Sequence, residues 1–513
     1  MSTTVDFPVE LTAEQEAISW EQEKLHWPRQ VTPLSFSVAM ACFMRGRNQA
    51  IEMTRRPFRI RGLRLNTYYY EGDEPADAPA GADYEAETLS YGGKLDRLWW
   101  GEHLPRIEQV LTEMETLGTA STAAELRADL DRVLELATEP WRIHFWLAGK
   151  WFYPTLALQV YFEELFPERS PAEANLLIAG FGNRTLECSL ALWRLVEAGG
   201  PSEAALAAYL HEHGRRSDLI DIAHPAWIEE PAPVLAEIEG YRADPARNPV
   251  AALSRAAARR EAELAACREQ LAGYPAPVRE RFDELVSNAQ VGIRVSEDHN
   301  FYIDFRCMYE VRRVVLTLGD ALVAEGRLDA RDDVFMLTLE ELELADLRPV
   351  VAAARAEMER FRGVVPPPHV GAAPAPPGPP PAADAAPSLG GRFEGQFWGV
   401  PPPELPAGAL AAGTPVSPGR ATGRARVLRS IEEASRLEPG DVLVTVTTQP
   451  PWSSLFARAA AVVTDTGGAL SHCAVVAREW GVPAVCGTGS GSETIPDGAL
   501  VTVDADAGVI YPA

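Results

Sequence analysis

The sequence predicts a multidomain fold: a mainly α-helical N-terminal domain followed by a compact α/β domain. In residues 1–362, apolar side chains recur at the spacing of amphipathic or buried helices. From residue 414 onward, short β-rich runs alternate with turns and short helical patterns. A Pro- and Ala-rich stretch, residues 364–388, separates the two regions. We therefore expect a helical domain at 1–362, a linker and connector at 363–413 and an α/β domain at 414–513.

Composition limits the class of protein. The chain has 513 residues, enough for two or three domains, and a net charge of −26. This acidity argues against binding to nucleic acid or to an anionic membrane surface, because both favour basic patches. The six cysteines have no paired spacing, and the N-terminus shows neither a signal peptide nor a membrane span. We expect free thiols and a cytoplasmic protein.

The helical domain contains long helical patterns. Residues 123–137 carry one apolar stripe, residues 141–166 are apolar nearly all round, and residues 277–325 continue the helical period. Asn248 suits an N-cap, and Pro249 suits the first position of the helix that follows it.

Two segments of this domain do not follow the helical pattern. Residues 58–70 alternate in polarity, which is typical of a hairpin or of an irregular segment. Residues 332–337 are expected to form a short strand. Thr338 and Glu341 then have the spacing of a capping box for the next helix.

Residues 364–388 contain few large apolar side chains, so this stretch cannot bury enough surface to fold alone. Its prolines favour a semi-extended conformation. A passive linker explains the composition, and a stiff tether would also suit a carrier domain that moves between two sites.

The C-terminal domain is predicted element by element from its alternating pattern. The expected strands are residues 424–428, 441–446, 460–464, 484–486 and 500–504. The expected helices are residues 431–437, 453–458 and 472–480.

The segment from Thr464 to Val485 carries the strongest chemical signal. Ser471 is a plausible N-cap, so His472 lies at the start of a helix, where free N–H groups and the helix dipole favour an anion. Gly467 and Gly468 lack Cβ atoms where the backbone would approach a ligand. A capping or core histidine is the simpler explanation for an isolated His. A zinc site is not expected, because His472, Cys473 and Cys486 lack ligand spacing and a fourth donor.

The pattern T-x-x-G-G-x-x-S-H, followed by VVARE and GVPAV, resembles the phosphohistidine (swivelling) domain of phosphoenolpyruvate synthase, pyruvate phosphate dikinase and rifampin phosphotransferase. The resemblance extends over roughly residues 414–511. Cys473 departs from it, because a small residue is usual at that position. The resemblance implies that His472 is the phosphorylated catalytic residue. The residues that it implies for phosphate binding or support are Thr464, Thr466, Gly467, Gly468, Ser471 and Arg478.

Relatives of this kind charge the histidine from ATP on an ATP-grasp domain or from phosphoenolpyruvate on a barrel domain. The sequence shows neither pattern, and no G-x-x-x-x-G-K-[ST] motif occurs. We therefore expect one subunit of a split enzyme. This chain would bind no metal or cofactor, and ATP and Mg²⁺ would act through a separate ATP-grasp nucleotide-binding subunit.

The helical domain would then hold the acceptor. Residues 311–342 resemble the end of the acceptor-binding domain of rifampin phosphotransferase and its relatives. Phosphoryl transfer to a hydroxyl needs a base and cationic groups. The acceptor-site candidates are His144, Arg294, Glu297, His299, Tyr302 and Arg306.

At helical spacing His299, Tyr302 and Arg306 share a face, whereas Glu297 does not share one with His299. A solvated or salt-bridged helix face explains the same residues. His144 also suits a satisfied core histidine. Aromatic side chains near Trp99 and in residues 141–153 favour an aromatic acceptor, although a helical core has the same composition.

The leading hypothesis is a phosphotransferase subunit, with rifampin phosphotransferase and phenylphosphate synthase as models. His472 would carry a phosphoryl group from the ATP-using partner to the hydroxyl of a small molecule. Two alternatives remain: a non-catalytic interaction or regulatory protein, and a subunit of a phosphoenolpyruvate synthase or dikinase type of enzyme. An adjacent ATP-grasp gene would favour the leading hypothesis, and a separate barrel-domain gene would favour the last.

Overall fold

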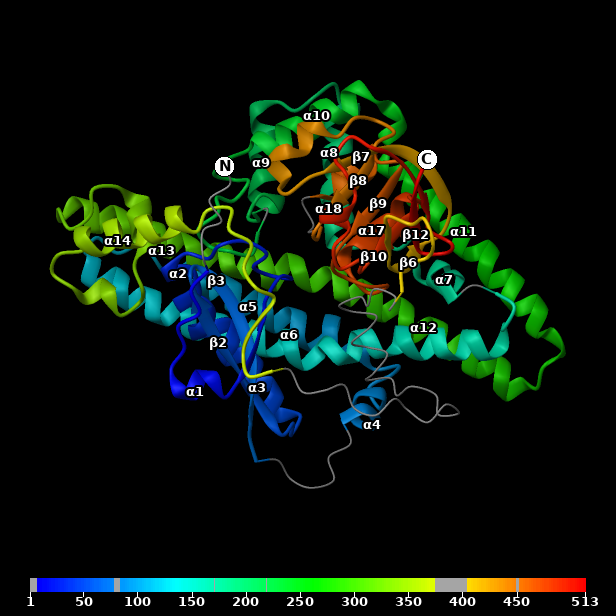
Figure 1. Cartoon of the computed structure of the whole chain (residues 1–513), viewed down its shortest axis with the longest axis horizontal. Coiled ribbons are helices and arrows are strands. Elements are labelled where there is room, and N and C mark those ends of the chain that lie inside the picture. The colour runs from blue at the N-terminus through cyan, green and yellow to red at the C-terminus, as the bar shows by residue number, and fades with distance from the viewer. Residues whose placement is uncertain (1–6, 78–83, 170, 218, 374–403, 449–451) are drawn as a thin grey trace.

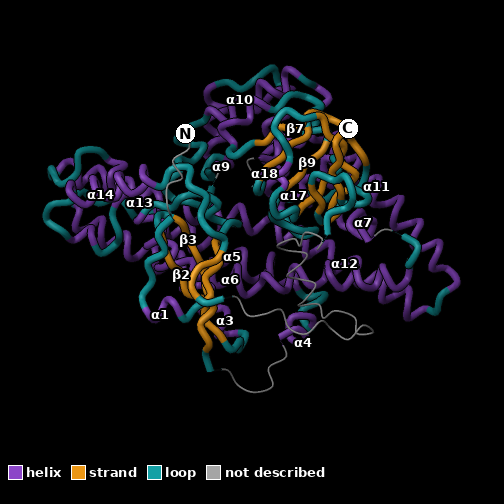
Figure 2. Tube along the Cα trace, viewed as in Figure 1, coloured by secondary structure: helices purple, strands orange, loops and turns teal. Residues whose placement is uncertain are grey.

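The computed structural model describes residues 7–77, 84–169, 171–217, 219–373, 404–448 and 452–513. Helices form most of the N-terminal part, and a sheet with short helices forms the C-terminal part (Figures 1 and 2). The predicted fold class is therefore confirmed. Among the described residues, no helix is both long enough and apolar enough to cross a bilayer.

The N-terminal part is built around long helices that pack side by side. Its helices, in chain order, are α1 (Ala13–Glu16), α2 (Pro33–Val38), η1 (Ala39–Met44), α3 (Arg45–Met53), α4 (Tyr84–Leu89), η2 (Arg97–His103), α5 (Leu104–Glu115), α6 (Ala123–Leu165), α7 (Pro171–Ala174), η3 (Asn175–Ile178), α8 (Arg184–Glu197), α9 (Glu203–His213), α10 (Ala232–Ala243), η4 (Pro245–Arg247), α11 (Pro249–Gln270), η5 (Leu271–Gly273), α12 (Ala276–His299), η6 (Asn300–Cys307), α13 (Met308–Ala324), η7 (Arg331–Met336), η8 (Glu341–Glu343) and α14 (Arg348–Arg360).

Helices α6 and α12 form the centre of this part (Figure 1). Helix α6 begins where the Thr122 side chain accepts the N–H of Glu125, an N-cap of the expected kind. The two helices approach closely at Gly292, because a Cβ atom there would lie 2.4 Å from the Trp151 carbonyl oxygen. Asn248 caps α11, and Pro249 occupies its first turn, as predicted.

Helix α12 continues into α13 through η6, a π-helical segment. A π-helix closes its hydrogen bonds five residues back instead of four, so side chains beyond Asn300 leave the faces that α-helical spacing assigns to them. Segments of this type are rare and are found frequently at functional sites.

A small antiparallel sheet packs against the helices, with strand order β2-β3-β1-β4. Strands β2 (Phe58–Leu65) and β3 (Tyr68–Pro75) form the hairpin that was one of two alternatives for residues 58–70. Strand β1 (Ser19–Gln22) pairs with β3 and with β4 (His369–Gly371). The first residues of the range expected to be a connector, 363–413, thus belong to this sheet. Residues 374–403, which include most of the Pro/Ala-rich stretch, lie outside the described residues.

The strand expected at 332–337 is wrong. Residues Arg331–Met336 form the 3-10 helix η7 instead. The Asp333 carboxylate accepts the N–H of Ala330 and pairs with Arg355, so local capping outweighs the β-rich composition. Thr338 and Glu341 do form the predicted capping box, and it begins the 3-10 turn η8.

Eight described strands of the C-terminal part form one sheet, in the order β5-β12-β11-β7-β8-β9-β10-β6. The five predicted strands are all present, and β7, β8, β9 and β10 are parallel neighbours. The elements are β5 (Ala411–Ala412), β6 (Thr414–Ser417), β7 (Arg420–Val427), η9 (Ile431–Arg436), β8 (Val442–Thr445), α16 (Ser453–Phe456), β9 (Ala461–Thr464), α17 (His472–Trp480), β10 (Ala484–Cys486), α18 (Gly491–Thr494), β11 (Leu500–Asp504) and β12 (Val509–Pro512).

The C-terminal part lies against the helices, above α12 and beside α11 in Figure 1. Helix α17 and the turn before it make this contact. Leu470 joins the main hydrophobic core of the helical part, and Val475 joins a second cluster that contains Phe162 and Phe282. The backbone N–H of Gly180 donates to the Glu479 carboxylate at 2.9 Å. This docking places the start of α17 against the middle of the long helices.

Candidate active site

The turn before α17 is shaped by hydrogen bonds to its own backbone. Ser471 is the N-cap, as predicted, and its hydroxyl accepts the N–H of Ala474 while donating to the Gly468 carbonyl at 2.8 Å. Gly467 has φ of +92°, and a Cβ atom there would lie 2.8 Å from the Ser471 side chain. Glycine is therefore required at this point of the turn.

The other side chains that the resemblance implies for phosphate support also bind backbone. Thr464 donates to the Thr466 carbonyl at 2.8 Å, and Thr466 donates to the Val446 carbonyl at 3.1 Å. The buried Arg478 guanidinium donates to the Ala469 carbonyl at 2.9 Å, and burial lowers its pKa to about 10. In this structure these three side chains hold the turn in shape and do not line the cavity beside it.

His472, the first residue of α17, is held from both domains. Its Nδ1 lies 3.3 Å from the Glu297 carboxylate of α12, and its Nε2 lies 3.4 Å from the Ser453 hydroxyl of α16. The imidazole is 11% exposed and the Glu297 side chain is 3% exposed. The pair therefore spans the boundary between the helical and the α/β parts.

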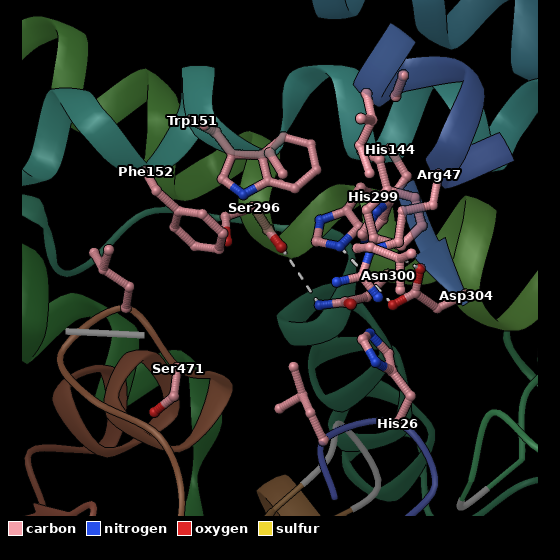
Figure 3. Close-up of a pocket in the computed structure, with 18 of the residues that line it drawn as sticks. His26, Arg47, His144, Trp151, Phe152, Ser296, His299, Asn300, Asp304 and Ser471 are labelled. Carbon is pink, nitrogen blue, oxygen red and sulfur yellow. Dashed lines mark hydrogen bonds and ion pairs between the residues drawn. The ribbon is translucent and has the colours of Figure 1, made fainter. Parts of the chain in front are cut away.

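A cavity of about 400 Å³ opens beside His472. Its α/β side consists of Thr448, Leu470, Ser471 and His472, and its other walls come from the helical part. Figure 3 shows Ser471 on one side, and His144, His299, Asn300 and Asp304 gathered on the other. Cavities of this size hold small-molecule ligands.

The cavity contains three of the six acceptor-site candidates, namely His144, Glu297 and His299. The His299 ring stacks on Trp151 with centroids 4.4 Å apart, and its centroid is 4.6 Å from that of His144. His144 is far from Glu297 and His299 in the sequence. The three residues come together because α6 packs on α12.

The other three candidates do not line the cavity. The Arg294 guanidinium lies 4.6 Å from the centroid of the Trp100 ring, and Arg306 pairs with Glu115 at 2.9 Å. Tyr302 packs on Phe301. Of the three residues expected on a common face, His299, Tyr302 and Arg306, only His299 reaches the cavity. The reason is that η6 changes the helical repeat directly after His299.

Sequence reasoning missed several cavity residues near the N-terminus. The Glu23 carboxylate accepts from His26 Nδ1 at 2.9 Å and from the backbone N–H groups of His26 and Trp27. Burial lowers the pKa of His26, but the Glu23 carboxylate outweighs burial and holds that pKa above its usual value. Arg47 also lines the cavity and pairs with Glu71 at 2.5 Å. The sequence signal that could have identified this region is the pair Glu23 and His26, three residues apart and followed by the aromatic Trp27.

Asp304 on η6 was also missed, and its surroundings are unusual. Burial raises the pKa of Asp304 to about 7 and lowers the pKa of His299 to about 3. Burial likewise places the pKa of His144 well below its usual value. The far side of the cavity thus combines two neutral imidazoles with a carboxyl group.

Two family models match the chain. Residues 437–508 match the mobile domain of PEP-utilising enzymes, and residues 194–297 match the fourth domain of rifampicin phosphotransferase. The first match includes His472, and the second ends at Glu297. The resemblance identified from residues 464–485 is therefore confirmed.

Curated relatives include proteins that are named as phosphotransferases. Chondramide synthase cmdD of Chondromyces crocatus is 31% identical over 99% of this chain and 14% of its own length. The uncharacterized phosphotransferase YvkC of Bacillus subtilis is 30% identical over 77% of this chain and 50% of its own length. Rifampicin phosphotransferase of Streptomyces sviceus is 30% identical over 61% of this chain and 35% of its own length. The chain thus spans half or less of the length of these relatives.

Proposed function

We propose that this chain acts in a phosphotransferase in which His472 carries a phosphoryl group to the hydroxyl of a small molecule bound in the cavity. One observation carries the proposal: His472 faces a ligand-sized cavity of the helical part while Glu297 holds its Nδ1. The matches to a PEP-utilising mobile domain and to rifampicin phosphotransferases support it.

The position of Glu297 favours Nε2 as the phosphorylated atom, because Nδ1 lies 3.3 Å from a carboxylate, whereas the partner of Nε2 is the neutral Ser453 hydroxyl at 3.4 Å. A carboxylate beside Nδ1 stabilises a proton on that atom. During transfer, the acceptor oxygen would form a bond to phosphorus as the P–N bond breaks. The electron pair would stay on Nε2, and the ring would leave as a neutral imidazole that keeps the Nδ1 proton. The hydroxyl proton would pass to a base or to water in the cavity.

The lining of the cavity suits an acceptor that carries an aromatic or apolar group. Phe145, Trp151, Phe152 and Tyr153 contribute to its walls. The Arg47 guanidinium, which pairs with Glu71, also lines the cavity, and cationic groups stabilise the oxygens of a transferring phosphoryl group. This arrangement supports the aromatic acceptor favoured by the composition.

We further propose that the phosphoryl group enters from an ATP-using, ATP-grasp module outside this sequence. In the docked arrangement His472 is largely covered, so charging requires the α/β domain to leave the helices. Phosphoenolpyruvate is the second candidate donor. Phosphoenolpyruvate synthase of Aeropyrum pernix is 50% identical over 21% of this chain and 14% of its own length, which keeps that alternative open.

The carrier role can be tested without knowing the donor. Phosphoramidate phosphorylates imidazoles directly, and intact mass counts the phosphates gained. We expect an acid-labile phosphate at His472 of the full chain, so that His472→Ala gains one phosphate fewer than wild type. His213→Ala is the matched control, because His213 lies outside the cavity. Equal labelling of His472→Ala and wild type would reject the carrier role. Repeating the assay with ATP or phosphoenolpyruvate and a candidate partner then identifies the donor.

A further inference from the structure

Two histidines and an aspartate meet on the wall of the cavity that faces His472. His144 comes from the middle of α6, His299 ends α12, and Asp304 lies on η6. Their side chains are 7%, 7% and 9% exposed, respectively. Figure 3 shows the three side chains directed toward one another. The π-helical segment is what places Asp304, five residues after His299, beside the His299 ring.

The distances in this cluster are too long for hydrogen bonds. Nε2 of His144 lies 3.9 Å from Asp304 Oδ1, and Nε2 of His299 lies 3.8 Å from Asp304 Oδ2. One donor atom from each residue lies within 4.8 Å of the other two. Two atoms that each coordinate one ion at about 2.1 Å can be at most about 4.2 Å apart. Both separations between the carboxylate and an imidazole fall within that limit, so an ion can bridge Asp304 and either histidine.

Some buried polar atoms of the cluster lack a hydrogen-bond partner in the part of the chain that the structure describes. Among the described residues, no hydrogen-bond partner reaches Asp304 Oδ1 or His144 Nδ1, although both atoms are buried. Burying such atoms without a partner is costly. A structure that needed only a packed core would have apolar side chains here. The three groups therefore point to a ligand that accepts electron pairs from all of them.

We propose that His144, His299 and Asp304 bind one divalent transition-metal ion, such as Zn²⁺, Mn²⁺ or Fe²⁺. Two imidazoles and a carboxylate suit these ions better than Mg²⁺ or Ca²⁺, which prefer oxygen ligands. Three protein ligands leave coordination positions open, and the positions left here face the cavity.

The role of the ion rests on the proposed function. An ion at this wall, opposite His472, binds the acceptor oxygen or a phosphoryl oxygen as a Lewis acid. It lowers the pKa of a bound hydroxyl, so the attacking oxygen loses its proton more readily. Sequence spacing gives no sign of the set, because His144 lies on a different helix from His299 and Asp304.

Metal binding can be measured without phosphoryl transfer. The full chain, purified without a histidine tag and stripped with a chelator, is titrated with Co²⁺ while its visible absorption is recorded. We expect one equivalent of Co²⁺ with a d–d spectrum, displaced by Zn²⁺ but not by an equal concentration of Mg²⁺. Asp304→Asn and His299→Gln should each weaken binding more than about 10-fold. His213→Gln should bind as wild type does.

Three results would overturn the site. These are the absence of stoichiometric binding by the wild type, unchanged affinity in both cluster variants, and equal loss in His213→Gln. Far-ultraviolet circular dichroism of Asp304→Asn, a variant of nearly the same shape, checks that the fold is kept. A chain that binds Co²⁺ but gains no phosphate from phosphoramidate would keep the metal site and reject the carrier role. The two failures are therefore distinguishable.

Discussion

Glu297 belongs to the helical part but contacts His472 of the α/β part, so its substitution separates two stages of the proposed reaction. In Glu297→Gln the side chain keeps its shape and loses its charge. In the proposed reaction His472 is charged away from the helices, so the rate of charging should stay within about twofold of wild type. Transfer from the docked phosphohistidine should slow about 10-fold, the loss expected for one charged hydrogen bond.

The measurement is single-turnover loss of phosphate from His472, with the best acceptor from a panel of phenols and other hydroxyl compounds. Glu284→Gln is the control, because Glu284 lies on the same helix α12 but pairs with Arg281 at the surface. Equal slowing of charging and of transfer would mean that Glu297 acts on the fold and not on the docked histidine.

His472 was predictable from the sequence because its signal is local. The N-cap, the glycines and the flanking strands all lie within a few residues of it. Glu297, His26 and Asp304 carry no such signal. Their positions around the cavity depend on the packing of α6, α12 and the N-terminal segment, which no local spacing encodes.

At the scale of the single element, the cap of α17 sets the position of His472. Ser471→Ala removes a side-chain acceptor from the first turn and should lower the free energy of unfolding of the α/β part by about 1 kcal/mol. Urea denaturation followed by the fluorescence of Trp452 and Trp480 measures this loss. Ser430→Ala is the control, because Ser430 precedes η9 without a side-chain capping bond. A similar loss of free energy of unfolding in both variants would contradict a stabilising contribution from the Ser471 cap.

The close contact of α6 with α12 gives a second element-scale prediction. In Gly292→Ala the new Cβ atom meets the Trp151 carbonyl oxygen at 2.4 Å, and this backbone atom cannot move without shifting α6. We expect a loss of about 1–3 kcal/mol in the free energy of unfolding, measured by thermal or urea denaturation. Gly273→Ala is the control, because a Cβ atom there meets nothing within 4 Å. Equal stability of the two variants would show that the helices separate easily.

Element prediction succeeded where one regular period holds and failed where the chain departs from it. The strands of the α/β part and the helices α6, α11 and α17 follow their patterns. The π-helix η6 cannot be seen in a pattern that assumes 3.6 residues per turn, and this error misplaced Tyr302 and Arg306. The strand prediction for residues Arg331–Met336 failed for another reason. Capping by Asp333 stabilises a 3-10 helix there in spite of the β-rich composition.

At the scale of the whole molecule, the sequence indicates two folded parts but not how they dock. The docked face of α17 offers Val475 and Glu479 to the helices, and Leu470 precedes it in the turn. Leu470 and Val475 would also suit the interior of an isolated α/β domain. Only the assembled structure shows that they join the apolar clusters of the helical part and that Glu479 binds the turn at Gly180.

The docked interface contains a carboxyl group that should make docking depend on pH. Burial raises the pKa of Glu479 to about 7, although its carboxylate accepts the Gly180 N–H, which acts in the opposite direction. The charged groups around it are Arg478 on its own helix, Glu297 on α12, and Arg259 and Arg260 on α11. When the domain leaves, the carboxyl group returns to water and to a pKa of about 4.3.

The direction in which pH shifts docking follows from this difference in pKa. Between about pH 4.3 and pH 7 the undocked carboxyl has lost its proton and the docked one keeps it, so rising pH favours undocking. The effect on the free energy of docking should approach about 4 kcal/mol and level off above pH 7. Small-angle scattering from pH 5.5 to 8.5 should show the radius of gyration increasing. Glu479→Gln should remain docked throughout, whereas Glu493→Gln, at an exposed site, should follow wild type. A transition that persists unchanged in Glu479→Gln would assign the pH dependence to another group.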